Sequence, residues 1–191
     1  GLKMAEGMSL DETIGKTIKR VLSGDDEAFS ILVDLYKNRV FSLAYRMVSS
    51  KEESEDLSQE VFLKIYNNLR YYNPQKAGFS TWIYRITYNQ CVDYLRRKKN
   101  TIPLKDAMMP VFAETPEDNV ITGEEIESLS KAVDKLPEIY RTPLILYHFH
   151  GLSYKEICQV MDVPMTIVKN RLFRARMTLR ETLTGGEHDV M

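Results

Sequence analysis

The chain has 191 residues, of which 43% are hydrophobic and 28% are charged, so it can form one large or two small packed domains. No apolar run approaches the length of a membrane span, and the N-terminus lacks the basic-then-apolar pattern of a signal peptide, so we expect a cytoplasmic protein. The net charge of −1 averages over separate acidic and basic clusters, and it therefore does not exclude binding to nucleic acid.

Two helices are predicted before residue 50. Ser9 and Glu12 form a capping box, and the apolar stripe that follows them stops at residues 23–24. The acidic pair at 25–26 begins the second helix, whose apolar residues repeat at helical spacing to about Val48. The length of this second helix is typical of a central scaffold.

A third helix begins with acidic side chains, which stabilise the positive end of the helix dipole. Its apolar positions recur at helical spacing from Leu57 to Leu69, with polar residues between them on the outside. Taken alone, this pattern is typical of a helix with a solvated acidic face. The acidic residues at its start are Glu52, Glu53, Glu55 and Asp56.

Residues 71–78 are predicted to form a loop, because asparagine, proline and glycine interrupt any periodic pattern there. A fourth helix follows, with Ser80 or Thr81 as its cap, and nothing breaks it before Asn100.

The two faces of the fourth helix differ in chemistry. One face is predicted to be buried: Phe79, Ile83, Ile86, Cys91 and Tyr94. The other is aromatic and basic and carries an amide: Trp82, Arg85, Asn89, Val92 and Arg96. Exposed aromatic rings stack on unpaired bases, and basic side chains follow phosphates, so this second face suits a strand that has been opened. The alternative is an amphipathic helix with its tryptophan in the core and a solvated basic end.

Residues 100–123 contain three prolines, small residues and acids without helical periodicity, so we predict a linker. Helical spacing returns from Glu124 to Leu136, and Pro137 begins the next helix at a position where proline is tolerated. Pro143 falls inside that helix, where we expect a kink or a late start. Gly151 is predicted to end it in a left-handed conformation.

The C-terminal segment predicts a helix-turn-helix. Ser153 and Glu156 form a second capping box, residues 162–164 make a turn, and a new helix runs from about Met165 to Leu183. The last helix is expected to expose residues that suit a DNA major groove: Lys169, Asn170, Phe173, Arg174 and Arg176. The alternative is a helical hairpin with a solvated basic face, but only one of the two helices is basic, which favours DNA binding.

Residues that carry catalytic chemistry are scarce. Cys91 and Cys158 lie among apolar residues without CxxC or CxxxH spacing, which indicates buried thiols and neither a disulfide nor a zinc site. His148 and His150 do not share a helix face. With no phosphate-binding loop, metal cluster or nucleophile–base pair, we predict that the chain is not an enzyme and needs no metal or cofactor.

The fourth helix and the C-terminal segment resemble one known family. Residues 79–97, from Phe-Ser-Thr-Trp-Ile-Tyr-Arg-Ile to the basic end, resemble the promoter-melting segment of the extracytoplasmic-function (ECF) sigma factors of bacteria. Residues 136–176 resemble the sigma region that reads the −35 promoter element. Residues 55–62 resemble the segment that docks on the clamp helices of the polymerase largest subunit. One departure is Thr166, where the family commonly has glycine.

The resemblance implies an all-α fold with two small helical domains: sigma region 2 at 9–99, an acidic linker at 100–123 that threads through the polymerase, and sigma region 4 at 124–184. The alternative for 100–123 is a plain solvated linker. Core RNA polymerase is the implied partner of Glu55, Asp56, Leu57, Gln59, Glu60 and Phe62. The −10 element, with a flipped base, is the implied partner of Tyr72, Lys76, Phe79, Trp82, Arg85, Asn89, Arg96 and Arg97. The −35 element is the implied partner of Lys169, Asn170, Arg171, Phe173, Arg174 and Arg176. An anti-sigma factor is implied as a further partner.

Three other classes of protein remain as alternatives. A conventional helix-turn-helix regulator would bind a duplex palindrome as a dimer and would not need the exposed tryptophan face. A degenerate sigma homologue would occupy the polymerase without starting transcription. An enzyme built on the acidic cluster is disfavoured, because those acids lie on one exposed helix without a histidine or metal partner.

Overall fold

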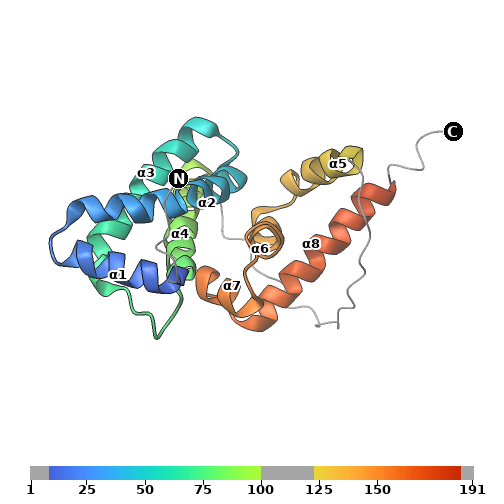
Figure 1. Cartoon of the computed structure of the whole chain (residues 1–191). Helices are drawn as coiled ribbons and strands as arrows, with labels where there is room; N and C mark the ends of the chain where they lie inside the picture. Colours follow the sequence, from blue (N-terminus) through green and yellow to red (C-terminus); the bar gives the residue numbers. More distant parts are fainter. Residues whose placement is uncertain (1–8, 100–122, 186–191) are drawn as a thin grey trace. The chain divides into compact units, whose positions relative to one another are not determined.

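The computed structural model describes residues 9–99 and 123–185, and all regular structure in these two ranges is helical, which confirms the all-α prediction. The chain divides into two compact units, Gly1–Leu95 and Arg96–Met191. Figure 1 shows helices α1 to α4 in blue to green and helices α5 to α8 in yellow to red. The predicted linker lies outside the described residues except for Gly123, which begins α5. None of the described helices combines the length and the apolar character that a membrane span requires.

The N-terminal helices follow the predicted order. They are α1 (Leu10–Leu22), α2 (Phe29–Val48), α3 (Lys51–Asn68) and α4 (Phe79–Lys99), with short 3₁₀ turns at Asp26–Ala28 and Leu69–Tyr71. The capping box at the start of α1 is confirmed: the Glu12 amide donates to the Ser9 hydroxyl at 3.2 Å, and the Ser9 amide donates to the Glu12 carboxylate at 3.3 Å.

The boundaries of α2 show one difference from the prediction. Asp25 caps the 3₁₀ turn that comes first, and α2 itself begins only at Phe29. At the other end Ser49 adopts a left-handed conformation with φ of 56°, which ends α2. Ser50 then caps α3 by accepting a hydrogen bond from the Glu53 amide at 3.4 Å.

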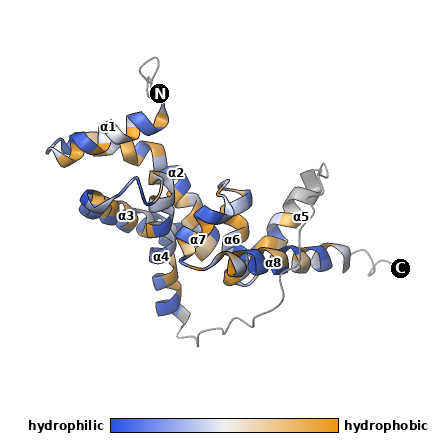
Figure 2. Ribbon diagram, turned by 90° about the horizontal axis from the view of Figure 1, so that it is seen from below, coloured by the Kyte–Doolittle hydropathy of each residue, from blue (hydrophilic) through white to orange (hydrophobic). Residues whose placement is uncertain are grey.

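The core of the N-terminal unit is built from the apolar stripes of all four helices. Ile18, Leu32, Val61 and Ile83 come from α1, α2, α3 and α4, and each is at most 8% exposed. Figure 2 shows that each of these helices carries both hydrophobic and hydrophilic residues. Full burial of one such side chain stabilises the fold by roughly 1.5–3 kcal/mol, so the shared core fixes α4 against the other helices.

The start of α4 corrects the predicted cap. The helix begins at Phe79, and the Trp82 amide donates to the carbonyl oxygen of Gly78 at 3.0 Å. Ser80 and Thr81 therefore lie inside the first turn, and neither is the cap. The Ser80 hydroxyl is used for a tertiary contact, because it lies 3.0 Å from the Tyr36 hydroxyl of α2.

The C-terminal unit contains α5 (Gly123–Asp134), α6 (Glu138–His148), α7 (Tyr154–Met161) and α8 (Met165–Gly185). Pro143 lies within α6, so the expected late start is wrong, because the helix already runs from Glu138. Gly151 has φ of 68°, as predicted for a left-handed residue after the helix. The Leu152 amide donates back to the carbonyl oxygen of Leu146 at 3.0 Å, which closes the turn.

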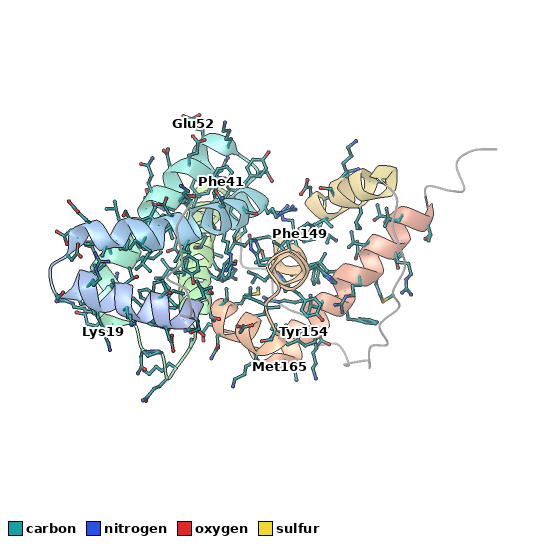
Figure 3. All side chains as sticks on the ribbon, viewed as in Figure 1. Lys19, Phe41, Glu52, Phe149, Tyr154 and Met165 are labelled. Carbon is teal, nitrogen blue, oxygen red and sulfur yellow. The ribbon has the colours of Figure 1, made fainter. Side chains whose placement is uncertain are left out.

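The predicted helix-turn-helix is formed by α7 and α8. Figure 3 labels Tyr154 and Met165, the residues that begin these two helices. Ser153 and Glu156 form the predicted capping box, and Asp162, with φ of 55°, ends α7. The predicted core side of α8 is confirmed, since Val168, Leu172, Ala175 and Leu179 are at most 8% exposed.

Candidate nucleic-acid interface

An open pocket of about 290 Å³ lies at the junction of α3 and α4. Trp82, Arg85 and Asn89 recur on α4 at a spacing of one turn, so they share one face and reach the pocket together. The full lining is Lys64, Asn68, Tyr71, Trp82, Arg85, Ile86 and Asn89. The pocket thus offers aromatic rings, two amides and two cationic side chains, which can hold a flat, polar ring bearing a phosphate.

The Trp82 ring is held by neighbouring aromatic rings. The centroid of Tyr72 lies 5.3 Å from that of Trp82, and the centroid of Phe79 lies 5.7 Å from it. Phe79 is only 5% exposed, so its ring packs against Trp82 and is not accessible to a base. Tyr72 is half-buried, and this burial raises the pKa of its phenol above the ordinary value. Both rings thus pack against Trp82. The family resemblance implies both residues as −10 contacts; the burial of Phe79 contradicts that role for its ring, and the role of Tyr72 stays a prediction.

The basic residues predicted for the same surface lie at its borders. Lys76 is exposed in the loop between the Leu69–Tyr71 turn and α4, and Arg96 and Arg97 are exposed near the end of α4. Cations near the C-terminus of a helix are stabilised by its dipole. Exposed side chains of this kind suit phosphates, which carry no sequence information.

The predicted polymerase-binding residues of α3 divide into exposed and buried groups. Glu55, Asp56 and Gln59 are exposed, whereas Leu57 is 3% exposed and belongs to the core. The carboxylate of Glu60, although exposed, accepts a hydrogen bond from the Gln90 amide of α4.

The outer surface of α3 also contains a residue that the sequence prediction omits. Leu63 is 63% exposed and lies one turn after Gln59. Together with Glu55, Asp56 and Gln59 it forms the exposed stripe of α3. Phe62, which was predicted to bind the polymerase, is half-buried and packs against the core.

On α8, the predicted DNA-reading residues lie on the side of the helix that faces away from the core. Lys169 is exposed, and Asn170, Phe173 and Arg174 are half-buried. Their spacing places them on the outer half of the helix, because Val168 and the other core residues occupy the inner half. Arg171 is also half-buried.

Arg176 of α8 contacts α6. Its guanidinium lies 5.6 Å from the centroid of the Tyr147 ring, and one of its nitrogens lies 3.5 Å from Nε2 of His148. Tyr147 in turn packs against Tyr154 of α7 with ring centroids 5.2 Å apart. Arg176 therefore joins α8 to α6, and it lies on the same side of α8 as Lys169, two turns earlier.

Comparison with known proteins decides the family. Residues 32–101 match Sigma-70 region 2, and residues 126–179 match Sigma-70, region 4. The chain is 34% identical over 185 residues to the ECF RNA polymerase sigma factor SigW of Bacillus subtilis (strain 168), covering 91% of this chain and 98% of that one. This chain belongs to the ECF sigma factors of the sigma-70 family.

Two further relatives are similar to this sigma factor. The ECF RNA polymerase sigma-E factor of Escherichia coli (strain K12) is 35% identical over 171 residues, covering 83% of this chain and 88% of that one. The solved structure of CnrH in complex with the cytosolic domain of CnrY has a TM-score of 0.65 and 20% identity, and it covers 91% of this chain and 98% of that one. The second likeness shows that the fold is shared.

The sigma factor does not need the glycine that its family commonly has at position 166. Ser49 and Asp162 are the two residues other than glycine with positive φ in the described parts of the chain. Thr166 therefore has a backbone conformation that any residue adopts, and it lies exposed in the first turn of α8. The helix starts normally, because the Ile167 amide donates to the carbonyl oxygen of Pro164 at 3.0 Å.

Proposed function

We propose that this sigma factor binds core RNA polymerase through the outer surface of α3, opens the −10 element at the α3–α4 pocket and reads the −35 element with α8. The observation that carries the proposal is the joint placement of Trp82, Arg85 and Asn89 in one pocket. A duplex regulator has no use for such a pocket, since paired bases are stacked inside the helix.

The proposed division of the chain follows these roles. Region 2 comprises residues 9–99, an acidic linker comprises 100–123, and region 4 comprises 124–184. The matches to region 2 at 32–101 and to region 4 at 126–179 support this division. The acidic linker would thread through the polymerase, as the family resemblance implies.

In the −10 complex, one unpaired base would enter the pocket and stack on Trp82. Such stacking is worth about 1–3 kcal/mol per base, which is comparable with the cost of flipping a base out of the duplex. Asn89 would pair with a base edge, while Arg85, Lys76, Arg96 and Arg97 would contact phosphates. The energy for opening the duplex thus comes from binding the opened strand, and no catalytic residue of this chain takes part.

In the −35 complex, α8 would lie in the major groove. Arg174 can donate two hydrogen bonds to a guanine edge, and Asn170 suits an adenine edge. Phe173 can contact a thymine methyl group, and Lys169 and Arg171 would contact phosphates. Arg176 supports the helix from the side of α6.

Binding to the polymerase would use the exposed stripe on α3. Glu55, Asp56 and Gln59 offer charge and hydrogen bonds, and Leu63 offers an apolar surface beside them. The clamp helices of the largest polymerase subunit are the proposed partner. Leu57, Phe62 and Glu60 would hold α3 in place.

An anti-sigma factor is the proposed regulator, and it would cover the polymerase-binding or DNA-binding faces. One structural neighbour supports this proposal, because the sigma factor RpoE of Bartonella quintana was solved with the anti-sigma factor NepR. The site of action would be the cytoplasm, where core polymerase acts.

Run-off transcription with purified bacterial core polymerase tests the proposal. A pool of promoter fragments is transcribed with and without this chain. We expect transcripts that start at one family of motifs only when the chain is added. Polymerase binding without any transcript would indicate a decoy, and binding to a duplex palindrome without polymerase would indicate a conventional regulator.

A further inference from the structure

Asn68 is the last residue of α3 and lines the same pocket as Asn89 of α4. Its Nδ2 atom donates a hydrogen bond to the carbonyl oxygen of Lys64, one turn earlier, at 2.8 Å. Only the nitrogen of an amide can donate to a carbonyl, so Oδ1 is the end of the amide that the helix does not hold. Asn68 is exposed, and this oxygen can therefore accept a hydrogen bond from a molecule in the pocket.

Asn68 is held in a fixed position by its neighbours. The next residue, Leu69, is 1% exposed and belongs to the core of the N-terminal unit. The end of α3 is thus anchored, and the amide is oriented by its bond to Lys64 before any base arrives. A polar group that is held in place in advance discriminates between partners better than a mobile one, because less freedom is lost on binding.

Few of the other polar side chains in the pocket can accept a hydrogen bond as Asn68 can. The cationic side chains of Lys64 and Arg85 only donate hydrogen bonds, so they cannot accept one from an amino group. The side chains of the lining that can accept are those of Asn68, Asn89 and Tyr71. Among these three, Asn68 is the one whose amide is oriented by a hydrogen bond to its own helix.

We propose that Asn68 determines which base the pocket accepts, because its Oδ1 accepts a hydrogen bond from an exocyclic amino group. This inference rests on the proposed function, in which one unpaired −10 base occupies the pocket. Cytosine and adenine carry an amino group where uracil and hypoxanthine, of the same shape, carry a carbonyl oxygen. A carbonyl oxygen facing Oδ1 forms no hydrogen bond and is repelled by it. The pocket therefore favours the amino base in each pair.

The test uses holoenzyme reconstituted from the full chain and bacterial core polymerase. A set of promoters is prepared in which one −10 position of the non-template strand at a time is substituted. At that position cytosine is compared with uracil, and adenine is compared with hypoxanthine. The amount of open complex is measured for each promoter. For the wild type we expect about a tenfold preference for the amino base at one position, because a base that covers Oδ1 without donating to it leaves an unpaired acceptor, which costs roughly that factor or more. Asn68→Leu should abolish the preference at that position, so that the two bases of each pair give about equal amounts of open complex. The substitution keeps the size of the side chain and removes the acceptor.

Two further variants distinguish a reading role from a structural one. Asn68→Asp retains an acceptor oxygen but loses the donor that binds the Lys64 carbonyl oxygen, so it should keep the preference for the amino base in reduced form. Asn67→Leu is the matched control, since Asn67 is the exposed neighbour on α3 and does not line the pocket, and it should behave as the wild type.

The possible results separate this inference from the proposed function. If Asn68→Leu keeps the preference and Asn89→Ala abolishes it, Asn89 reads the amino group alone and the inference is overturned while the −10 function stands. If the wild type shows no amino preference at any position, the inference is also overturned. The proposed function fails as well only if open-complex formation does not depend on the −10 sequence.

Discussion

The hydroxyl groups of Tyr36 on α2 and Ser80 on α4 lie 3.0 Å apart. Tyr36 is 2% exposed, and its ring also packs edge-on against Phe79 with centroids 5.5 Å apart. The scaffold helix α2 thus holds the first turn of α4, and Phe79 in turn supports the Trp82 ring of the pocket. We therefore expect the orientation of the α4 face that carries Trp82 to depend on this contact.

Tyr36→Phe removes one hydroxyl and leaves the ring in place. We expect it to lower the free energy of unfolding by about 1 kcal/mol, because the Ser80 hydroxyl loses its partner in a partly buried place. Urea denaturation followed by the fluorescence of Trp82 measures this change, since it is the only tryptophan of the chain. Tyr45→Phe is the control, because Tyr45 is 47% exposed, and an equal loss for both variants would show that the Tyr36–Ser80 contact adds nothing.

Alkaline pH should destabilise the N-terminal unit. Burial raises the pKa of the Tyr36 and Tyr84 phenols in the folded chain. A raised pKa in the folded state means that the stabilising contribution is complete below the unfolded value of about 10 and is lost as the pH rises through the folded value. Unfolding measured from neutral to strongly alkaline pH should show this decline. The decline should be smaller for Tyr36→Phe, and an identical curve would contradict the assignment to Tyr36.

The loop before α4 is folded around Asn73. Its side-chain oxygen accepts a hydrogen bond from the Gln75 amide at 2.9 Å, and its carbonyl oxygen accepts one from the Lys76 amide at 3.1 Å. We expect Asn73→Ala to speed hydrogen exchange of the Gln75 amide and to reduce −10 opening, because the loop must then be ordered on binding. Asn73→Asp, which retains the acceptor, should restore both properties.

The side chain of Gln75 provides the control for this loop. Only its backbone amide takes part in the turn, so Gln75→Ala should leave both hydrogen exchange and −10 opening unchanged. Fast exchange in Asn73→Ala with normal −10 opening would show that the loop order does not serve the promoter.

Arg174 and Arg176 are predicted to act differently on −35 DNA. Arg174→Ala should cost about 1–3 kcal/mol on the preferred −35 sequence and much less on a changed one, if the side chain pairs directly with a base. Arg176→Ala should weaken binding equally for all sequences and should lower the stability of the C-terminal unit, because its guanidinium contacts Tyr147 and His148. Binding titrations with matched and altered −35 duplexes measure both effects. A uniform loss for Arg174→Ala would instead identify a phosphate contact.

Local signals in the sequence predict much of the fold. The capping boxes at Ser9 and Ser153 fix the starts of α1 and α7, and the apolar stripes identify the core side of α8. The cap of α4 could not be predicted in the same way. Ser80 is a good capping residue by type, but its hydroxyl forms a contact with Tyr36, which lies 44 positions away in the chain.

The sequence predicts only part of the pocket, because some of its residues are brought together by contacts between helices that are distant in the chain. Trp82, Arg85 and Asn89 share one helix face, so their spacing alone brings them together. Asn68 and Tyr71 join them because the end of α3 packs beside α4, and no local pattern signals this. For Phe79 the helical spacing predicts burial, whereas the family resemblance implies a DNA contact. The structure confirms the burial, because the Phe79 ring packs against Tyr36 of α2.

The measurement that tests the central claim most directly compares wild-type holoenzyme with the Asn89→Ala variant on one promoter. Permanganate reactivity of unpaired thymines reports opening of the −10 region, and the affinity for core polymerase is measured in parallel. We predict that Asn89→Ala impairs opening and −10 discrimination and leaves the polymerase affinity nearly unchanged, because Asn89 lies in the pocket and not on the exposed stripe of α3. Unchanged opening, or an equal loss of opening and polymerase affinity, would contradict the role of the pocket.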